Sequence, residues 1–286
     1  MQAEVLSTTA YRARAFSSFE ELVIPPGCYV ELPPCPYSQG QTVLVYGTLV
    51  AGRGWNVSTT RGSRATLTGC TIEGQGGALE LTGCIGTLRG ATQALAQHST
   101  LELWDQARAT IDEDPGAPRP SNIRMVGKTH CVVRRGKPRI FPAESAVVEA
   151  GGDAIVAPSG RQFCGRILAA GHAVVDWNAG VYPDDRFELV LAGDCVARVV
   201  LPAGELRAKA TQRARLTIDA RPQGRASLEI GDKVAADIGT NCTCTAAGDA
   251  HVTARGTARV RLLERASVTE VGDLVDVRQG AAPATR

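Results

Sequence analysis

The acidic residues that could carry chemistry gather at a few places in the chain. They are Asp112, Glu113, Asp114, Asp153, Asp176, Asp184 and Asp185. Enzymes that cleave polysaccharides use two carboxyl groups, one as acid and the other as base or nucleophile. The triplet at 112–114 precedes a Pro-Gly pair, and acidic residues commonly form such turns. We therefore expect a turn at this triplet, and another at the two acids after Pro183.

One acidic group also has an aromatic neighbour. Asp176 and Trp177 lie close in sequence to Asp184 and Asp185. A tryptophan ring offers a flat apolar face to a sugar, and carboxylates bind its hydroxyl groups, so these four residues form the candidate glycan site. A loop with a packed tryptophan is the alternative. We assign no residue a catalytic role.

The nine cysteines are many for a cytoplasmic product, and an odd number cannot all pair within one chain. Cys70 and Cys84 each follow a Leu-Thr-Gly motif, so we expect them at equivalent positions on neighbouring turns. Buried thiols that pack as small hydrophobic groups are the alternative to disulfides. The candidates for disulfide pairing are Cys28, Cys35, Cys70, Cys84, Cys242 and Cys244.

The remaining motifs predict no metal and no cofactor. Cys242, Cys244 and His251 are soft ligands, but a zinc site normally has a second pair of ligands nearby. The end of a P-loop is matched at 127–129, whereas Asn122 stands where the first glycine belongs and no helix pattern follows. The four histidines have no evident serine or cysteine partner. We therefore predict that the protein is not an enzyme.

Composition indicates the elements that position these residues. The chain has 31 Gly, 15 Pro and only 5% aromatic residues, which is typical of many short strands separated by turns. The formal charge is +2 and the basic residues are spread out, which argues against a nucleic-acid partner. Neither a signal peptide nor a membrane span is apparent. We expect synthesis in the cytoplasm and no membrane partner.

Short segments repeat in the C-terminal third of the chain. Ala250–Ala254, Ala258–Leu262 and Ala266–Glu270 recur at a spacing of eight residues, and Ala214–Ile218 returns as Ala226–Ile230 after twelve. Alternate residues are apolar, as in a half-buried strand. One unit cannot bury its apolar side alone, so stacked units forming a β-solenoid are expected. Three units of eight would make a triangular turn of about 24 residues.

The last repeat departs from this pattern. Glu270 places a charge in an apolar slot, and the segment 274–277 slips by one residue relative to the units before it. Charged residues that point inward are one way to protect the edge of a sheet. The sequence therefore predicts that the last turn is frayed or capped.

A weaker set of repeats lies between residues 42 and 111. Leu67–Cys70 recurs as Leu81–Cys84 after fourteen residues, and Leu79–Leu81 recurs as Leu101–Leu103 after twenty-two. The spacing of twenty-two is close to the length of one full turn of a parallel β-helix. Residues 123–212 are less regular, so the solenoid is either interrupted or decorated there.

The predicted fold class is therefore all-β, a parallel β-helix or β-solenoid with short turns that is either interrupted or decorated in the middle. Its regions are an attachment segment at 1–41, an N-terminal solenoid at 42–111, a loop or boundary at 112–122, an irregular β region at 123–212, C-terminal repeats at 213–280 and a tail at 281–286.

Two segments resemble known families. Val23–Val30 is similar to the first strand of right-handed parallel β-helices of the pectate-lyase-like superfamily, which includes phage tailspikes. The Ala-x-Val-x-Ala units of residues 250–270 resemble alanine-valine-threonine repeat arrays of phage and prophage proteins from GC-rich bacteria. The resemblance to the repeat arrays implies a virion component with no assigned chemistry.

The function predicted from the sequence is that of a structural phage virion protein, a spike, fibre, or capsid or tail decoration. We expect it in the virion as a homo-oligomer, with a trimer favoured, because solenoid edges must be covered. Its partners would be other virion proteins and a host-surface glycan. The alternatives are a β-helical polysaccharide-degrading enzyme and a bactofilin-like polymerising scaffold in the bacterial cytoplasm.

Overall fold

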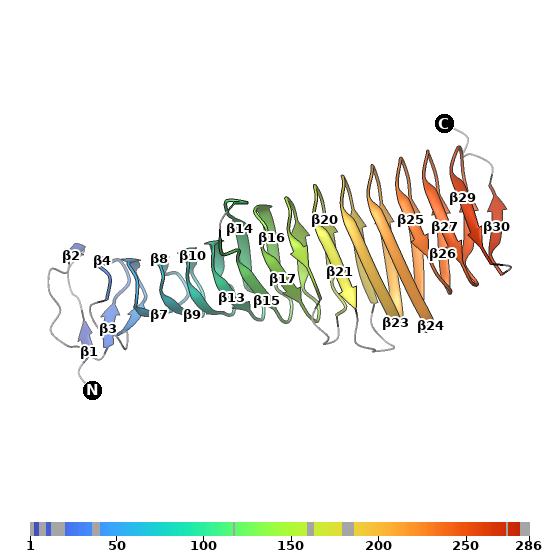
Figure 1. Ribbon diagram of the computed structural model, residues 1–286. Helices are drawn as coiled ribbons and strands as arrows, with labels where there is room; N and C mark the ends of the chain where they lie inside the picture. Colours follow the sequence, from blue (N-terminus) through green and yellow to red (C-terminus); the bar gives the residue numbers. More distant parts are fainter. Residues whose placement is uncertain are drawn as a thin grey trace, which may run out of the picture. The chain divides into compact units, whose positions relative to one another are not determined.

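A computed structural model describes residues 3–5, 10–12, 21–35, 41–116, 118–158, 163–178, 186–272 and 274–280. These residues form β-strands and turns without any helix, and hence without a helix able to cross a membrane. In each unit the strands form a parallel sheet wound into a β-solenoid, with about 14 turns in all (Figure 1). The predicted fold class is confirmed. The chain divides into two units, Met1–Arg139 and Ile140–Arg286.

Each turn of unit 1 contributes one strand to each of two faces, because every strand pairs with the strand two places along the chain. The first face consists of β1 (Ala3–Val5), β3 (Glu21–Ile24), β5 (Thr42–Val45), β7 (Asn56–Thr59), β9 (Thr71–Gly74), β11 (Ile85–Leu88), β13 (Thr100–Leu103) and β15 (Asn122–Met125). The second face consists of β2 (Ala10–Arg12), β4 (Tyr29–Leu32), β6 (Thr48–Ala51), β8 (Arg64–Thr68), β10 (Ala78–Thr82), β12 (Gln93–Gln97), β14 (Arg108–Asp112) and β16 (His130–Arg135).

Unit 2 is built in the same way, with two long strands that each pass from one face to the other. These are β23 (Val196–Ala210) and β24 (Arg215–Ile230). Their first halves join a face formed by β17 (Arg139–Pro142), β19 (Ile155–Val156), β21 (Val174–Asn178), β25 (Ala235–Ile238), β27 (His251–Arg255) and β29 (Ser267–Val271). Their second halves join β18 (Val147–Ala150), β20 (Arg166–Ala169), β22 (Arg186–Leu191), β26 (Cys242–Ala246), β28 (Arg259–Leu262) and β30 (Asp276–Gln279).

The prediction of a triangular turn is wrong. Ala235 pairs with His251, and His251 pairs with Ser267, so one turn near the C-terminus takes 16 residues. Each turn thus has two faces of eight residues rather than three. The repeat of eight is half a turn, because consecutive units lie on opposite faces.

The prediction of a twenty-two-residue turn between residues 42 and 111 is also wrong. Leu81 pairs with Leu67, fourteen residues earlier, so the shorter repeat is the true turn. The second copy of the longer repeat, Leu101–Leu103, lies on β13, on the face opposite β10. An apolar-polar-apolar triplet fits either face of a two-sided solenoid, which is why the match misled.

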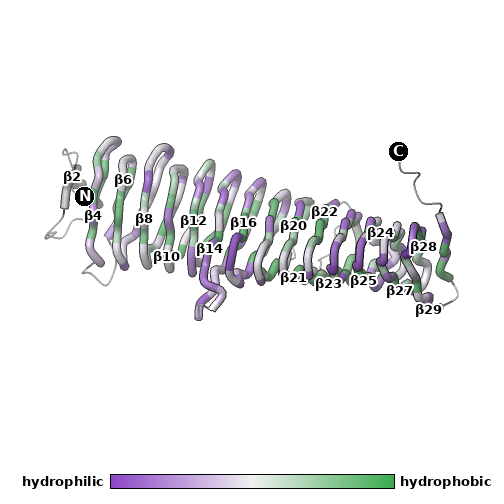
Figure 2. Tube along the Cα trace, turned by 90° about the horizontal axis from the view of Figure 1, so that it is seen from above, coloured by the Kyte–Doolittle hydropathy of each residue, from purple (hydrophilic) through white to green (hydrophobic). Residues whose placement is uncertain are grey.

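Alternate side chains along each strand point into a continuous apolar core. On β24 the residues at positions 216, 218 and 220, and again at 224, 226, 228 and 230, are buried, and the other residues of the strand are exposed. The same alternation of apolar and polar residues can be followed along the trace in Figure 2. The core is mostly leucine, isoleucine, valine and alanine. Any one strand is too short to bury these groups without its neighbours in the stack.

The middle of the chain keeps the solenoid pattern within the described residues. β15 and β16 continue unit 1, and β18 to β23 pair in parallel in unit 2. The turns here are longer, as in the step of 22 residues from Val174 to Val196. The expected interruption therefore does not occur in these strands, and the irregular sequence comes from longer connections. The predicted tail, 281–286, lies outside the described residues.

The final turn carries polar groups at inward positions. Glu270 on β29 pairs with the buried Ala254, and Gln279 on β30 pairs with Leu262, yet both polar side chains are exposed. The step from Arg259 to Asp276 is 17 residues, one more than in the turn before, which matches the slip seen in the sequence. Such residues discourage another strand from adding to this edge.

Candidate functional site

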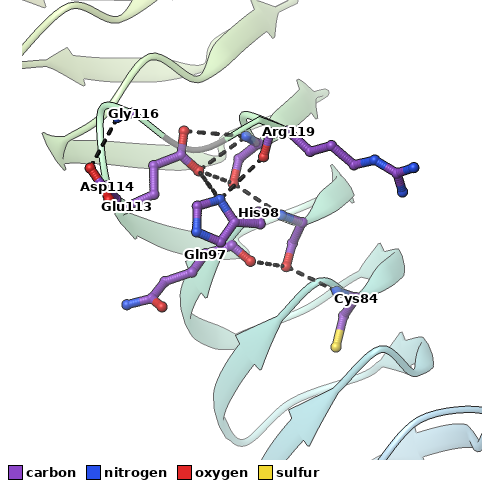
Figure 3. Close-up of polar contacts among 9 residues, drawn as sticks. Cys84, Gln97, His98, Glu113, Asp114, Gly116 and Arg119 are labelled. Atoms are coloured by element: carbon purple, nitrogen blue, oxygen red, sulfur yellow. Dashed lines mark hydrogen bonds and ion pairs between the residues drawn. The ribbon is translucent and has the colours of Figure 1, made fainter.

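A polar cluster surrounds the side chain of Glu113, which follows β14 and reaches His98 at the corner between β12 and β13 (Figure 3). Glu113 is 2% exposed. Its carboxylate accepts hydrogen bonds from the backbone N–H of Ser121 at 3.0 Å, from the hydroxyl of Ser121 at 2.7 Å and from the backbone N–H of His98 at 3.2 Å. These donors compensate the cost of burying a charged group.

Neighbouring turns explain why a carboxylate is needed at this corner. Gly69 and Gly83 adopt left-handed φ angles and donate their N–H groups to carbonyls of the next turn, at 2.8 and 2.9 Å. His98 has the same conformation, with φ of 51°, but the connection 113–121 separates β14 from β15. The carboxylate of Glu113 accepts the hydrogen bond that a backbone carbonyl accepts at the corners of Gly69 and Gly83.

Gly136 provides the space for this side chain. A Cβ atom at position 136 would overlap the Cγ of Glu113, and the φ of Gly136 is +106°, a conformation that favours glycine. The backbone carbonyl of Arg135 also accepts a hydrogen bond from the N–H of Glu113, at 3.3 Å. The glycine and the buried acid therefore depend on each other.

His98 contacts the C-terminal end of the connection 113–121. Its Nδ1 lies 3.1 Å from the carbonyl oxygen of Arg119 and 3.7 Å from Oε2 of Glu113. The carbonyl can only accept, so we infer that the neutral ring carries its proton on Nδ1. The ring thus ties the connection 113–121 to the body of the solenoid.

This cluster positions a loop and lacks the geometry of a hydrolytic triad. In a triad the serine donates to a histidine, which takes its proton. Here Ser121 donates to Glu113, and Ser99 donates to the carbonyl of Gln97 at 2.8 Å. The hydroxyl groups of both serines also accept backbone N–H groups, at 3.1 Å each. The serines are therefore part of the corner's hydrogen-bonded ladder.

Sequence reasoning missed the role of Glu113, His98, Ser99 and Ser121. A signal existed, because the motif Leu-Thr-Gly-Cys at Leu81–Cys84 is followed fifteen residues later by Ala-Gln-His-Ser. Histidine replaces glycine and serine replaces cysteine at equivalent corner positions. The partner of that histidine lies across an insertion, which repeat counting cannot bridge.

The other acids near this loop have local partners. Asp112 forms an ion pair with Arg135, Oδ1 to Nε at 2.5 Å, and this contact raises the pKa of the arginine. Asp114 accepts the N–H of Gly116 at 3.0 Å, as expected for a turn. The three consecutive acids therefore point to three different environments and do not converge on one site.

The candidate glycan site is only partly described. Asp176 is exposed on β21, whereas Trp177 is 3% exposed and points to the other side of the strand. The ring of Trp177 packs edge-on against Phe187, with centroids 4.0 Å apart, and lies 6.4 Å from Phe163. Its face is therefore part of the core. Asp184 and Asp185 lie outside the described residues, and the site as a whole stays a prediction.

No disulfide joins any of the nine cysteines, all of which lie in the described ranges. Cys70 and Cys84 occupy equivalent positions on consecutive turns, as predicted, and their thiols contact each other. Cys242 and Cys244 both point into the core from β26. Cys28 is buried and Cys35 is half-buried. Pairing among these six residues stays a prediction.

A groove crosses β24, β26 and β28 on the second face of unit 2. Small polar side chains separate long arginines there, since Ser227, Thr243 and Arg259 occupy one register position on successive strands. An adjoining hollow shares two of its residues and adds Arg261. The groove is lined by Glu205, Arg225, Ala226, Ser227, Asn241, Cys242, Thr243, Thr257 and Arg259.

The arginines of this groove differ from others on the unit. Arg166 pairs with Glu188 at 3.1 Å, and Arg255 pairs with Asp237 at 2.6 Å, both across adjacent strands. Within the part of the chain that the structure describes, Arg225, Arg259 and Arg261 form no ion pair. Their guanidinium groups are therefore available to an acidic ligand, which arginine binds through two parallel hydrogen bonds.

Comparison with family models, with curated proteins and with solved structures gave no match. The class of protein is therefore defined by the fold and its surfaces. It is a parallel β-solenoid with two strands per turn, an anchored loop in unit 1 and an arginine-lined groove in unit 2.

Proposed function

We propose that the chain is a structural scaffold protein of a phage virion, a spike, fibre or decoration component that acts through rigidity and attachment. The observation that carries the proposal is the stack of parallel strands in each unit, hydrogen-bonded from one turn to the next. Such a stack gives every turn backbone and core contacts with both neighbours. Such a stack is suited to a component whose function depends on a rigid shape.

Interactions on the outer surface support the same function. Ion pairs connect side chains of successive turns, including Lys209 with Glu229 at 3.3 Å. Single exposed pairs stabilise little, whereas a series of them along a stack restrains its outer surface. Carboxylates also accept backbone N–H groups of the preceding turn at corners, as Asp232 does from Gln212 at 2.9 Å. The apolar core and the polar contacts of the outer surface therefore both stabilise the scaffold.

The arginine groove is the proposed attachment surface. Arg225, Arg259 and Arg261 would bind carboxylates on a neighbouring virion protein, and Ser227 and Thr243 would supply hydrogen bonds. Charge complementarity of this kind guides association and fixes orientation. A host-surface glycan with acidic groups is the competing ligand.

The proposed assembly includes self-association, with a trimer as the preferred state. Sedimentation of the purified chain measures this state directly. A trimer is the expected result, and a monomer at all concentrations would contradict self-association. End-to-end polymerisation, as in the bactofilin-like alternative, is disfavoured by Glu270 and Gln279 at inward positions of the last turn.

The function is tested by quantifying the chain in purified phage particles from cells that carry its gene. A fixed copy number per particle is expected. Absence from particles would overturn the virion assignment, whereas cleavage of host surface polysaccharide by the purified chain would favour the β-helical enzyme. In that second case, loss of cleavage in Asp176→Ala would place the activity at the candidate glycan site.

A further inference from the structure

Cys70 and Cys84 are placed as two equivalent thiols on adjacent turns. Leu67 and Thr68 pair with Leu81 and Thr82 before the corner, and Thr71 pairs with Ile85 after it. Adjacent strands of a sheet lie about 4.8 Å apart, and a disulfide spans Cα atoms about 4.4–6.8 Å apart. The spacing of the turns therefore suits a cross-turn disulfide.

The backbone also aligns the two side chains. Gly69 and Gly83, which precede the cysteines, have nearly equal left-handed φ angles of 61° and 63°. The N–H of Gly69 donates to the carbonyl of Thr82 at 2.8 Å, and the N–H of Ile85 donates to the carbonyl of Cys70 at 3.0 Å. With the same conformation and fixed register, the two Cβ atoms leave the backbone in the same direction.

The two thiols contact each other in a closed environment. Cys70 is 2% exposed and Cys84 is 0% exposed, and a hydrogen bond joins their sulfur atoms. This hydrogen bond lowers the pKa of Cys84, because the Cys70 thiol stabilises the Cys84 thiolate. The thiolate is the reactive form of cysteine, so Cys84 is the more reactive member of the pair.

We propose that Cys70 and Cys84 form an oxidation site, at which hydrogen peroxide converts the two thiols into a disulfide that links consecutive turns. The inference is independent of the proposed virion function. A small oxidant suits the site, because it must enter through local opening of a corner that is closed to larger disulfide reagents.

The chemistry balances in two steps. The Cys84 thiolate attacks one oxygen of hydrogen peroxide, the O–O bond breaks, and the departing hydroxide takes up a proton to become water, which leaves a sulfenic acid. Cys70 sulfur then attacks the Cys84 sulfur, the S–O bond breaks, and the hydroxyl group leaves as water with the proton of Cys70. Two thiols are oxidised and one peroxide is reduced to two waters.

The experiment uses the full chain, treated with hydrogen peroxide under native conditions, quenched with catalase and then unfolded in an alkylating reagent. Cleavage after glutamate cuts at Glu73 and Glu80, between the two cysteines. A disulfide holds the fragments containing Cys70 and Cys84 together until a reductant separates them. Mass spectrometry of the digest shows the linked pair directly.

The expected result is a linked pair that disappears in Cys70→Ser and in Cys84→Ser. Cys131→Ala is the matched control, because Cys131 is buried and pairs in register with Ala109 rather than with another cysteine. The link should persist in this control. Recovery of Cys70 and Cys84 as alkylated or overoxidised residues, with circular dichroism showing a folded chain during treatment, would overturn the proposal.

Discussion

The carboxylate of Glu113 accepts the backbone N–H of His98 at 3.2 Å, where the equivalent corners at Gly69 and Gly83 use a backbone carbonyl. A side chain thereby completes the hydrogen-bonded ladder at the one corner of unit 1 that the connection 113–121 interrupts. The solenoid tolerates this insertion because a buried acid compensates for it. Stability should depend strongly on that acid.

Replacement of Glu113 by alanine should lower the free energy of unfolding by about 3 kcal/mol, because it leaves the donors of Ser121 and His98 buried without their acceptor. Urea unfolding followed by circular dichroism measures the change. Asp114→Ala is the matched control and should cost less than about 1 kcal/mol, since Asp114 is exposed. Equal costs for the two variants would contradict the account of this corner.

Gly136→Ala should destabilise the protein because its Cβ overlaps Glu113 and its φ is +106°. Gly62→Ala separates these two causes, since Gly62 has a φ of +88° with nothing within 4 Å of an added Cβ. We expect about 1 kcal/mol from backbone strain at Gly62 and about 3 kcal/mol at Gly136. Similar melting temperatures for the two variants would show that the space at Gly136 is not needed by the Glu113 side chain.

Trp177→Ala should cost about 3–5 kcal/mol, because it opens a cavity beside Phe163 and Phe187. Asp176→Ala, next to it on the exposed side of β21, should change stability by less than about 0.5 kcal/mol. Thermal unfolding of both variants provides the measurement. A Trp177 variant as stable as the parent chain would mean that the ring is not part of the core.

High pH should weaken the fold through its buried thiols. Burial raises the pKa of Cys131 to about 12 from an ordinary value of 9.0. Between these two pKa values the folded thiol keeps its proton while the unfolded thiol loses it. The contribution of Cys131 to the free energy of unfolding is therefore complete below pH 9 and is lost as pH rises from 9 toward 12. In that pH range the free energy of unfolding falls by about 1.4 kcal/mol per pH unit.

Cys131→Ala should therefore reduce the drop in unfolding free energy between pH 8 and pH 10 by about 1 kcal/mol. Urea titrations at the two values provide the test. Cys164→Ala, at an exposed cysteine, should leave the drop unchanged. An unaltered drop in the Cys131 variant would contradict the assigned pKa.

Much of the fold was predictable from local pattern. The alternation in segments such as Ala250–Ala254 predicts half-buried strands, and the recurrence of Leu67–Cys70 as Leu81–Cys84 gives the true turn length near the N-terminus. The number of faces was not predictable, because a repeat of eight fits two faces or three equally well. Only the pairing of His251 with Ser267, sixteen residues apart, distinguishes them.

The candidate sites were less predictable, because they depend on contacts between turns. Asp112, Glu113 and Asp114 look alike in sequence, yet only Glu113 is buried. Register places a carboxylate beside Arg225 and beside Arg259, as it does beside Arg166. Only the side-chain geometry shows that Arg166 forms an ion pair and that the groove arginines do not. Pairing in space, rather than residue type, separates these residues.

The most direct test of the scaffold account measures how the chain distributes between purified particles and free protein. The parent chain and an Arg61→Glu control, altered at an exposed turn outside the groove, should be found in particles at the same copy number. The double variant Arg225→Glu and Arg259→Glu should remain free although it folds. Incorporation of the double variant at the parent level would contradict attachment through the groove, and absence of the parent chain from particles would contradict the scaffold function itself.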